Sequence, residues 1–343
     1  MKRLLSCLLV LGLLVCLPAC GLFGGGVNYD FSYLNSEKYS AGNTLIEQSE
    51  GLQNLHISWY KGDVTIKTHK EDYILIDELA NGVLEDSHRV HHNYQVDPQG
   101  VGTLFIEYGA SGVKDYTDEM QKDLIVTIPE YNNYYIGVTS GYANITVDTD
   151  DYENTLRKLS ITTDCGAVHA NIYHANVVQI AGYGVDAGDS DNRVYELHAV
   201  GTIHTLGFNS SYAKIILTAD TVNGMDNVGS VFETTHITIN HAKDVKLSGS
   251  RSEYFVYLKE FTSLTIEGRE RPIHIYLPED TQFTLDITRV EYFEGEEDRV
   301  SDSVVIDFEG VTRISDTKYV VGNGEKSIHI TTYHDIEISP LQG

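Results

Sequence analysis

The chain has few basic residues, few cysteines and no long apolar run after Cys20. It contains 24 Lys and Arg against 50 Asp and Glu among 343 residues, so its formal net charge is −26. A surface this acidic repels phosphate backbones and anionic lipid head groups, and we therefore expect no nucleic-acid partner. A transmembrane helix needs about 20 consecutive apolar residues, and the sequence beyond Cys20 predicts none.

Three of the four cysteines, Cys7, Cys16 and Cys20, lie at the start of the chain. Met1-Lys2-Arg3, the apolar run from Leu4 to Leu17 and the small residues that follow make up the three parts of an export signal. Leu17-Pro18-Ala19-Cys20 also resembles the lipobox of bacterial lipoproteins. The resemblance implies cleavage behind Ala19 and a diacylglycerol on the sulfur of Cys20, and an ordinary secretory signal is the alternative.

These motifs divide the chain into three predicted parts. We expect a lipoprotein signal peptide at 1–19, the lipid-attachment cysteine with a flexible tether at 20–43, and one β-strand-repeat domain at 44–340. Two acyl chains, at ~0.8 kcal/mol per buried methylene, would anchor the protein stably. It would be exported and held on the outer face of the bacterial cytoplasmic membrane, or at the outer membrane of a Gram-negative envelope. Apart from Cys20, only Cys165 would remain, so no intrachain disulfide is expected.

Proline is also scarce, with 6 residues, whereas Gly and Tyr number 30 and 23. From Thr44 onward, short runs of alternating apolar and polar residues are joined by Gly, Asn or Asp, which is typical of strands and turns. Between Ile136 and Thr284 these units recur roughly every 20 residues, the length of one coil of a β-solenoid. The sequence thus predicts an all-β fold, a single elongated β-solenoid-like stack of short strands. An antiparallel sandwich is the alternative.

Residues 77–123 depart from this alternation. The segment begins with an acidic, His-rich stretch and continues with a strand-like run at 103–108. A helix of one or two turns is predicted around 115–122. We therefore expect an N-terminal cap or hairpin region here rather than a further coil.

Three stretches together carry a family resemblance. Leu124 to Pro129 introduces the coils, 275–288 follows them, and 328–338 closes the chain. This layout resembles the putative-adhesin family of β-strand-repeat domains of unknown function, found in bacterial envelope proteins and lipoproteins. The resemblance implies a β-solenoid-like fold and an envelope location, and it implies no catalytic residue. The family usually has Gly before the final strand, whereas this chain has His334-Asp335, so the turn must be made differently.

Two acidic clusters are candidate calcium sites. Calcium takes six to eight oxygen ligands, which clustered carboxylates in the turns of an exported protein can provide. Solvated acidic turns are the alternative, and no other cofactor is expected. The weak calcium candidates are Asp148, Asp150 and Asp151 in one cluster, and Asp186, Asp189 and Asp191 in the other.

Fourteen histidines invite a transition-metal interpretation, since His-x4-His occurs three times. Residues five apart on one strand point to opposite faces, so such a pair cannot bind one ion without a turn between them. We therefore predict exposed histidines on the polar faces of strands. The pairs are His169 and His174, His236 and His241, and His329 and His334.

The sequence lacks a phosphate-binding loop, a Gly-x-Ser-x-Gly elbow and a His-Glu-x-x-His motif. We therefore expect a non-enzymatic, lipid-anchored cell-envelope protein that presents an acidic β-solenoid surface for contacts with an envelope protein or glycan. Tyrosines near turns and strand ends could stack on sugars or partners, or pack along adjacent coils. Two alternatives stay open: an enzyme acting on envelope polysaccharide, and a calcium-dependent structural module.

Overall fold

The computed structural model describes residues 32–47, 49, 51–113, 120–130, 133–149, 155–182, 193–290 and 303–341. Residues 31–343 form one compact unit. The described residues contain strands and two short 3-10 helices and no α-helix, which confirms the predicted all-β class. Consequently, this part of the chain offers no helix long and apolar enough to span a membrane. The predicted signal peptide and Cys20 lie outside the described residues.

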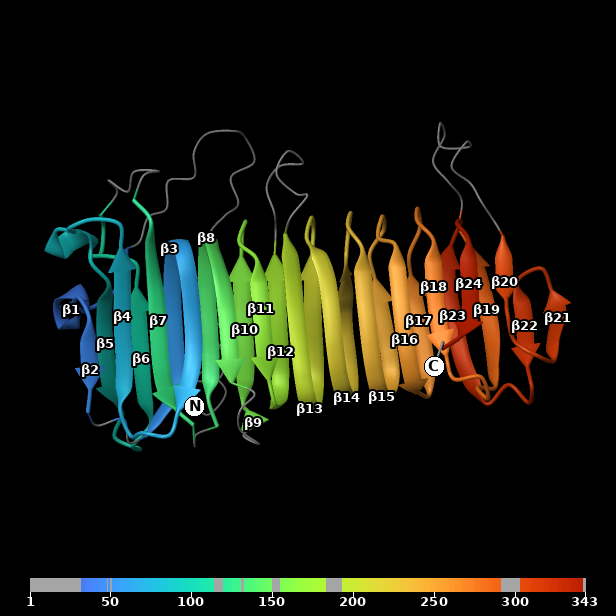
Figure 1. Ribbon diagram of the computed structural model, residues 1–343, viewed down its shortest axis with the longest axis horizontal. Helices are drawn as coiled ribbons and strands as arrows, with labels where there is room; N and C mark the ends of the chain where they lie inside the picture. The colour runs from blue at the N-terminus through green and yellow to red at the C-terminus, as the bar shows by residue number, and fades with distance from the viewer. Residues whose placement is uncertain are drawn as a thin grey trace, which may run out of the picture. The chain divides into compact units, whose positions relative to one another are not determined.

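The strands follow one another along the chain, most of them separated by only a few residues (Figure 1). Their bounds, with those of the two 3-10 helices, are η1 Ser36–Lys38, β1 Ser40–Ala41, β2 Thr44–Ile46, β3 Leu52–His69, β4 Ile74–Ala80, η2 Asp86–His88, β5 His91–Val96, β6 Gly102–Glu107, β7 Lys122–Pro129, β8 Tyr135–Thr149, β9 Thr155–Leu156, β10 Lys158–Thr163, β11 Val168–Ile172, β12 His174–Gly182, β13 Val194–Ser210, β14 Lys214–Ser230, β15 Thr235–Ser248, β16 Tyr254–Glu260, β17 Ser263–Glu267, β18 Ile273–Leu277, β19 Phe283–Arg289, β20 Val304–Ile306, β21 Val311–Ser315, β22 Lys318–Val321, β23 Lys326–Thr332 and β24 Ile336–Pro340.

From β8 to β18 the strands pair in parallel, and each pairs with the corresponding strand of the next repeat. The recurrence predicted from the sequence matches the spacing along the chain between paired residues. Because the pairs are parallel, the antiparallel sandwich does not describe this part of the chain. A representative series of paired residues is Leu197, Leu217, Ile237, Val256 and Ile275.

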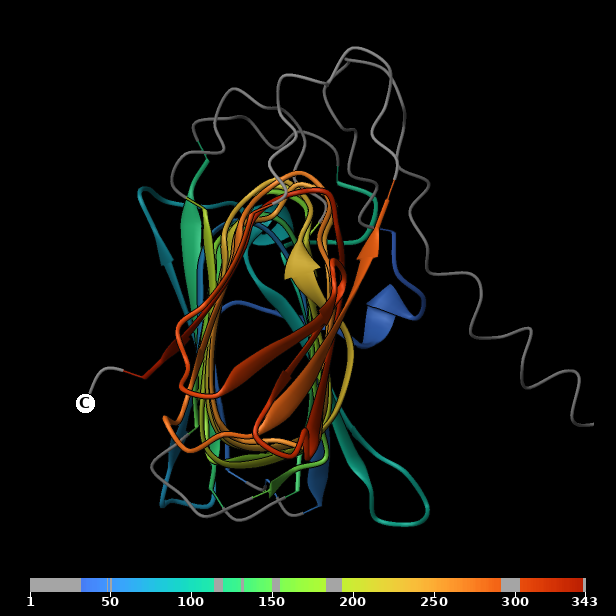
Figure 2. The same cartoon turned by 90° about the vertical axis from the view of Figure 1, so that its right-hand side faces the viewer.

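The core lies inside a ring of strands, which is seen end-on in Figure 2. Along the regular stretches of the strands every second residue points inward, and the inward residues of successive repeats pack on one another; Leu197 and Ile237, for example, are both fully buried. Each such side chain contributes about 1.5–3 kcal/mol through removal from water. One repeat alone could not bury its apolar face, so the repeats depend on their neighbours for stability.

The N-terminal region combines antiparallel pairs, as the sequence predicted for a hairpin or cap, with parallel pairs of β3 to β6, β7 and β8 that the prediction of a separate cap did not include. The antiparallel pairs join β1 to β5, β2 to β4, β4 to β7, and β5 to β6. The predicted helix around 115–122 is wrong at its three described residues, because 120 and 121 are not helical and Lys122 begins β7. Residues 115–119 of that prediction lie outside the described residues.

The turn before the last strand is stabilised by side chains in place of the missing glycine. The backbone N–H of His334 donates to the hydroxyl of Thr332 over 3.0 Å, and that of Asp335 donates to Nδ1 of His334 over 2.8 Å. The carboxylate of Asp335 accepts from the N–H of Ser303 over 3.1 Å. The chain therefore makes this turn with side-chain hydrogen bonds and without glycine.

A buried ion pair links β4 to β7 in the N-terminal region. Nζ of Lys122 lies 2.7 Å from a carboxylate oxygen of Glu78, and the two side chains are 0% and 4% exposed. The ammonium also donates to the carbonyls of His88 and Tyr108, and it lies 4.2 Å from the Tyr108 ring centroid and 5.0 Å from that of Trp59. Burial lowers the pKa of Lys122 to about 8, although the charge of Glu78 acts to raise it.

We expect Lys122→Met to change how the stability of the protein depends on pH. An unfolded lysine keeps its proton to about pH 10.4, whereas folded Lys122 loses it near pH 8. Between pH 8 and 10 the unfolded state therefore binds more protons, and the wild-type free energy of unfolding should gain on the order of 2 kcal/mol from this group. Lys122→Met should lack that gain, and at pH 7 it should lose about 3–5 kcal/mol because Glu78 is left buried without its partner.

Urea unfolding of the full chain at pH 7, 8, 9 and 10 measures both effects. Lys246→Met, which alters an exposed lysine of β15, is the matched control. If the free energy of unfolding depends on pH in the same way in Lys122→Met and in the control, the Lys122–Glu78 pair does not cause the expected rise between pH 8 and 10.

Candidate functional site

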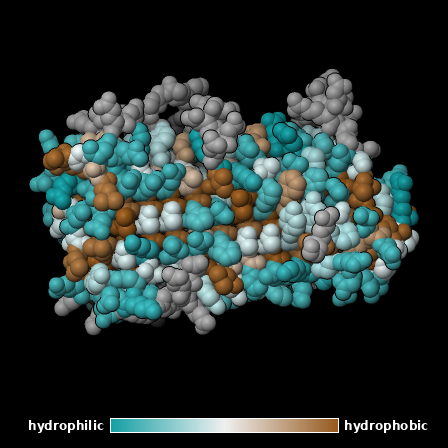
Figure 3. Space-filling model, in the orientation of Figure 1, coloured by the Kyte–Doolittle hydropathy of each residue, from teal (hydrophilic) through white to brown (hydrophobic). Residues whose placement is uncertain are grey.

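The outward residues of successive repeats form continuous rows that cross the strands. On the face drawn in Figure 3, apolar and intermediate colours run along the middle and hydrophilic colours along the edges. Two neighbouring rows on β13, β14, β15, β16, β18 and β24 are named here row A and row B. Row A consists of Glu196, Ile216, His236, Phe255, His274 and Glu337, and row B of His198, Thr218, Thr238, Tyr257, Tyr276 and Ser339.

Aromatic rings stack on one another within both rows. In row A the ring centroids of His236 and Phe255 are 4.6 Å apart, and those of Phe255 and His274 are 4.9 Å apart. In row B the rings of Tyr257 and Tyr276 are 4.4 Å apart and inclined by only 9°. Since the ring faces cover each other along the row, the edges of the stacked rings point outward. The result is a rigid aromatic surface spanning three repeats.

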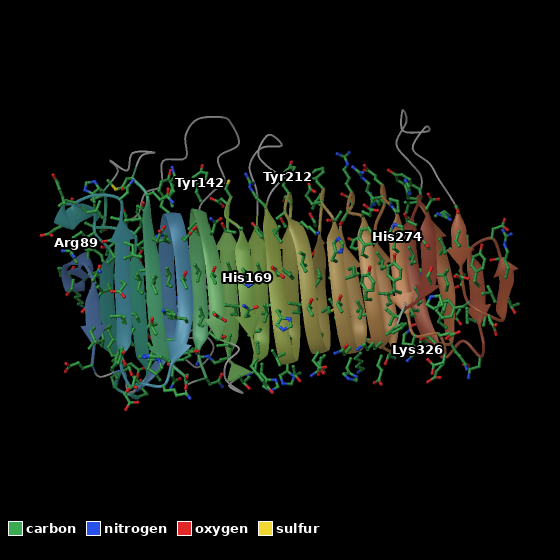
Figure 4. All side chains as sticks on the ribbon, in the orientation of Figure 1. Arg89, Tyr142, His169, Tyr212, His274 and Lys326 are labelled. Carbon is green, nitrogen blue, oxygen red and sulfur yellow. The ribbon has the colours of Figure 1, made fainter. Side chains whose placement is uncertain are left out.

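Carboxylates of neighbouring strands surround this aromatic surface. Nδ1 of His274 lies 3.0 Å from Glu337, and its Nε2 lies 3.4 Å from Glu253. His169, labelled with His274 in Figure 4, lies 3.0 Å from Glu196 on the next repeat. Burial lowers the pKa of His236, whose ring is packed against Phe255. Together these contacts make an aromatic face bordered by acidic groups.

The predicted histidine pairs are not brought together as metal ligands. His169 faces Glu196, whereas Nδ1 of His174 accepts from the N–H of Thr202 over 2.8 Å. His241 lies 3.0 Å from Glu260, on the neighbouring strand. Within the described ranges, no three or more His, Cys, Asp or Glu side chains are grouped closely enough to bind a metal ion.

Of the six calcium candidates, only Asp148 falls on a described residue. It is exposed on β8, between its register partners Lys67 and Asn171. Asp150 and Asp151 follow this strand, and Asp186, Asp189 and Asp191 fall between β12 and β13; all five lie outside the described residues. The calcium hypothesis therefore stays a prediction.

The tyrosines divide between the core and the turns. Tyr134 and Tyr195 are 2% and 1% exposed, so neither can contact a partner. Tyr212 lies at the turn edge marked in Figure 4, and its ring stacks on that of Phe232 at 4.6 Å. The guanidinium of Arg251 lies 5.4 Å from the Phe232 ring. These turn residues pack along adjacent repeats.

Glu107, on β6, is a candidate site residue that the sequence analysis missed. It is half-buried beside its register partner Ser58, and burial raises its pKa to about 7, although a hydrogen bond from Ser58 acts to lower it. Burial raises the pKa values of Tyr33 and Tyr39 to about 12, and the charge of nearby Glu107 acts in the same direction. At neutral pH, Glu107 can therefore donate or accept a proton.

A small polar hollow adjoins Glu107 through Ser58. Gly137 is the register partner of His56, the Tyr135 ring covers the place where a Gly137 side chain would begin, and a hollow of about 120 Å³ lies beside them. No sequence motif marks this place, because its groups come from three strands joined only by the pairing register. The polar groups that line it include His56, Ser58, Tyr135, Thr139, Ser160 and Thr162.

Comparisons with known proteins give little further information. No protein-family model and no curated protein matches the chain. A solved structure described as a "putative cell adhesion protein" from Clostridium sporogenes is similar over 88% of this chain and 100% of that chain, with 11% identity and a TM-score of 0.23. At this TM-score the likeness carries no argument, so membership of the putative-adhesin family stays a prediction.

We expect Glu107→Gln to stabilise the protein above neutral pH. Because the folded pKa of about 7 exceeds the ordinary value of 4.5, the folded state binds more protons between pH 4.5 and 7. The contribution of Glu107 to stability is therefore full below pH 4.5 and falls as the pH rises through 7. Glu107→Gln keeps the size and a hydrogen-bonding group but removes this fall, and at pH 8 it should gain on the order of 2 kcal/mol.

Thermal and urea unfolding of the full chain at pH 4.5, 6 and 8 tests this expectation. Glu325→Gln, which alters an exposed carboxylate, is the matched control and should leave the pH dependence as in the wild type. A parallel pH dependence of Glu107→Gln and the wild type would show that Glu107 titrates normally.

Proposed function

We propose that the protein is a non-enzymatic, lipid-anchored envelope protein of β-solenoid-like architecture that presents its outward rows for contacts with an envelope protein or glycan. Cys20 would carry the diacylglycerol and residues 20–43 would hold the folded part away from the bilayer. The anchor requires no contact between the acidic body and lipid head groups, which would repel it.

The observation that carries this proposal is the continuity of rows A and B. In-register parallel pairing places outward residues from distant parts of the chain side by side. The stacked rings of Phe255, His274, Tyr257 and Tyr276 provide a flat, rigid surface. Because these side chains are already ordered in the folded protein, binding a partner would cost little further conformational entropy. Aromatic residues held in this way favour recognition by contact over a broad face.

Glu107 favours a second candidate function, an enzyme acting on envelope polysaccharide. The carboxyl group of Glu107 has a pKa of about 7 and lies near a polar hollow. General acids in enzymes typically have a pKa near the working pH in the same way. Glycoside hydrolysis uses two carboxyl groups, and the residues lining this hollow supply none. The binding proposal is therefore preferred.

Membrane fractionation of the Cys20→Ala variant tests the anchor. The wild-type chain should sediment with membranes, and Cys20→Ala should appear in the soluble exported fraction because two acyl chains supply the attachment. Cys165→Ser is the matched cysteine control and should stay with the membranes. Membrane retention of Cys20→Ala would contradict lipid anchoring.

Affinity capture from envelope extracts tests the binding surface. The full chain in detergent is used as bait, with calcium or with a chelator, beside the double variant Phe255→Ala/Tyr276→Ala and the control Thr146→Ala. We expect a component that the wild type and the control retain and the double variant loses. Retention only with calcium would favour the calcium-dependent module, and equal retention by all three proteins would contradict a role for rows A and B.

A further inference from the structure

The stack of rings in row B ends abruptly at Tyr257. One face of the Tyr257 ring packs on Tyr276, at 4.4 Å between centroids. On its other side, the next two positions of the row are Thr238 and Thr218, and the following ring is that of His198. Neighbouring strands are about 4.8 Å apart, so a gap two repeats wide separates the Tyr257 and His198 positions.

A hollow of about 190 Å³ lies at this end of the ring stack. Thr238, which is exposed, and Ile239 line it beside Tyr257. Asn240, Lys259 and Leu341 complete its lining. A flat ring placed over Thr238 would therefore meet the Tyr257 ring in the position that a further aromatic residue of row B would occupy.

Asn240 and Lys259 bring polar groups into the lining of the same hollow, and the carboxylate of Asp220 lies beside it, next to Asn240. Nδ2 of Asn240 donates to a carboxylate oxygen of Asp220 over 3.0 Å. That hydrogen bond is the main cause that holds the pKa of Asp220 below its ordinary value, and the charge of Lys259 acts in the same direction. Lys259 is exposed beside the Tyr257 ring. The border thus offers a carboxylate as acceptor, and an amide and an ammonium as donors.

We propose that this hollow is a subsite for one pyranose ring of a neutral glycan, whose apolar C–H face stacks on Tyr257 and whose hydroxyls bind Asp220, Asn240 and Lys259. The inference rests on the proposed function, because it names the ligand class of rows A and B. Vicinal hydroxyls both donate and accept hydrogen bonds, which matches a border that combines a carboxylate with two donor groups.

The charge of the site selects a neutral ligand. Asp220 and Lys259 offset each other locally, so the border supplies no surplus positive charge for a uronate or phosphate. The net charge of −26 on the whole chain adds long-range repulsion of polyanions. The lining combines the Tyr257 ring and the apolar residues Ile239 and Leu341 with polar groups of Asn240 and Lys259, which suits a ligand that has an apolar face and hydroxyls at its edge.

Titration of the full chain in detergent with cellotetraose, mannotetraose, chitotetraose and tetragalacturonate tests the subsite, read by calorimetry and saturation-transfer NMR. We expect at least one neutral tetrasaccharide to bind and tetragalacturonate not to bind. Tyr257→Ala removes the ring face and Thr238→Tyr fills the gap with a further ring of the stack. Each should weaken binding at least tenfold, while Thr146→Tyr, the same substitution at an outward position of β8, should leave it unchanged.

The two Thr→Tyr variants keep the test decisive if Tyr257→Ala unfolds, which thermal unfolding would reveal. Absence of binding by all three neutral tetrasaccharides, or binding unchanged by Thr238→Tyr, would overturn the glycan subsite. An envelope protein that the wild type captures and Thr238→Tyr loses, without any tetrasaccharide binding, would also overturn it. In that last case the proposed function would stand, with a protein as its partner.

Discussion

In-register parallel pairing between successive repeats is the constraint on which the rest of the structure depends. Because paired residues lie one repeat apart along the chain, the alternation of apolar and polar residues recurs at the same height in the next repeat, except at a few register shifts where β14 pairs with β13 and β15. The inward members form one continuous core, and the outward members form rows. A shift of one residue in any repeat would turn its apolar side chains outward, so the core fixes the register and thereby the surface.

Stacking also explains how the outward surface becomes rigid without disulfides. The rings of Phe255 and Tyr257 are held by neighbours on adjacent strands, and His274 is held by carboxylates on both sides. At the N-terminal end, where antiparallel pairs are added to the parallel pairs of β3, the buried pair of Lys122 and Glu78 provides a polar link between β4 and β7. The buried ion pair thus lies in the N-terminal region, on β4 and β7, whereas the stacked aromatic rings lie on the parallel strands β16 and β18.

Much of the fold could be predicted from local patterns, since alternation and turn residues act within a few positions. They were enough for the all-β class, the recurrence of the strand units and the hairpin region before β7. The site could not be predicted in the same way. Glu107 meets Ser58, which lies on a strand much earlier in the chain, and the hollow beside Tyr257 is lined by its register partner Thr238. Such pairs are defined by which strands are adjacent, and a sequence without its register does not contain that information. The same reasoning accounts for Lys122, whose place in a buried ion pair no local pattern distinguishes from an exposed lysine.

Disulfide trapping tests the pairing register most directly. In a Cys165→Ser background, cysteines at 218 and 238 would have Cα atoms about 4.8 Å apart, within the range that a disulfide bridges, whereas cysteines at 218 and 257 would be separated by two strand spacings, or about 10 Å. The account predicts rapid crosslinking of Thr218→Cys/Thr238→Cys under mild oxidation and none of Thr218→Cys/Tyr257→Cys. Equal crosslinking of both pairs, or crosslinking of the second pair alone, would contradict parallel stacking in this register and the rows that follow from it.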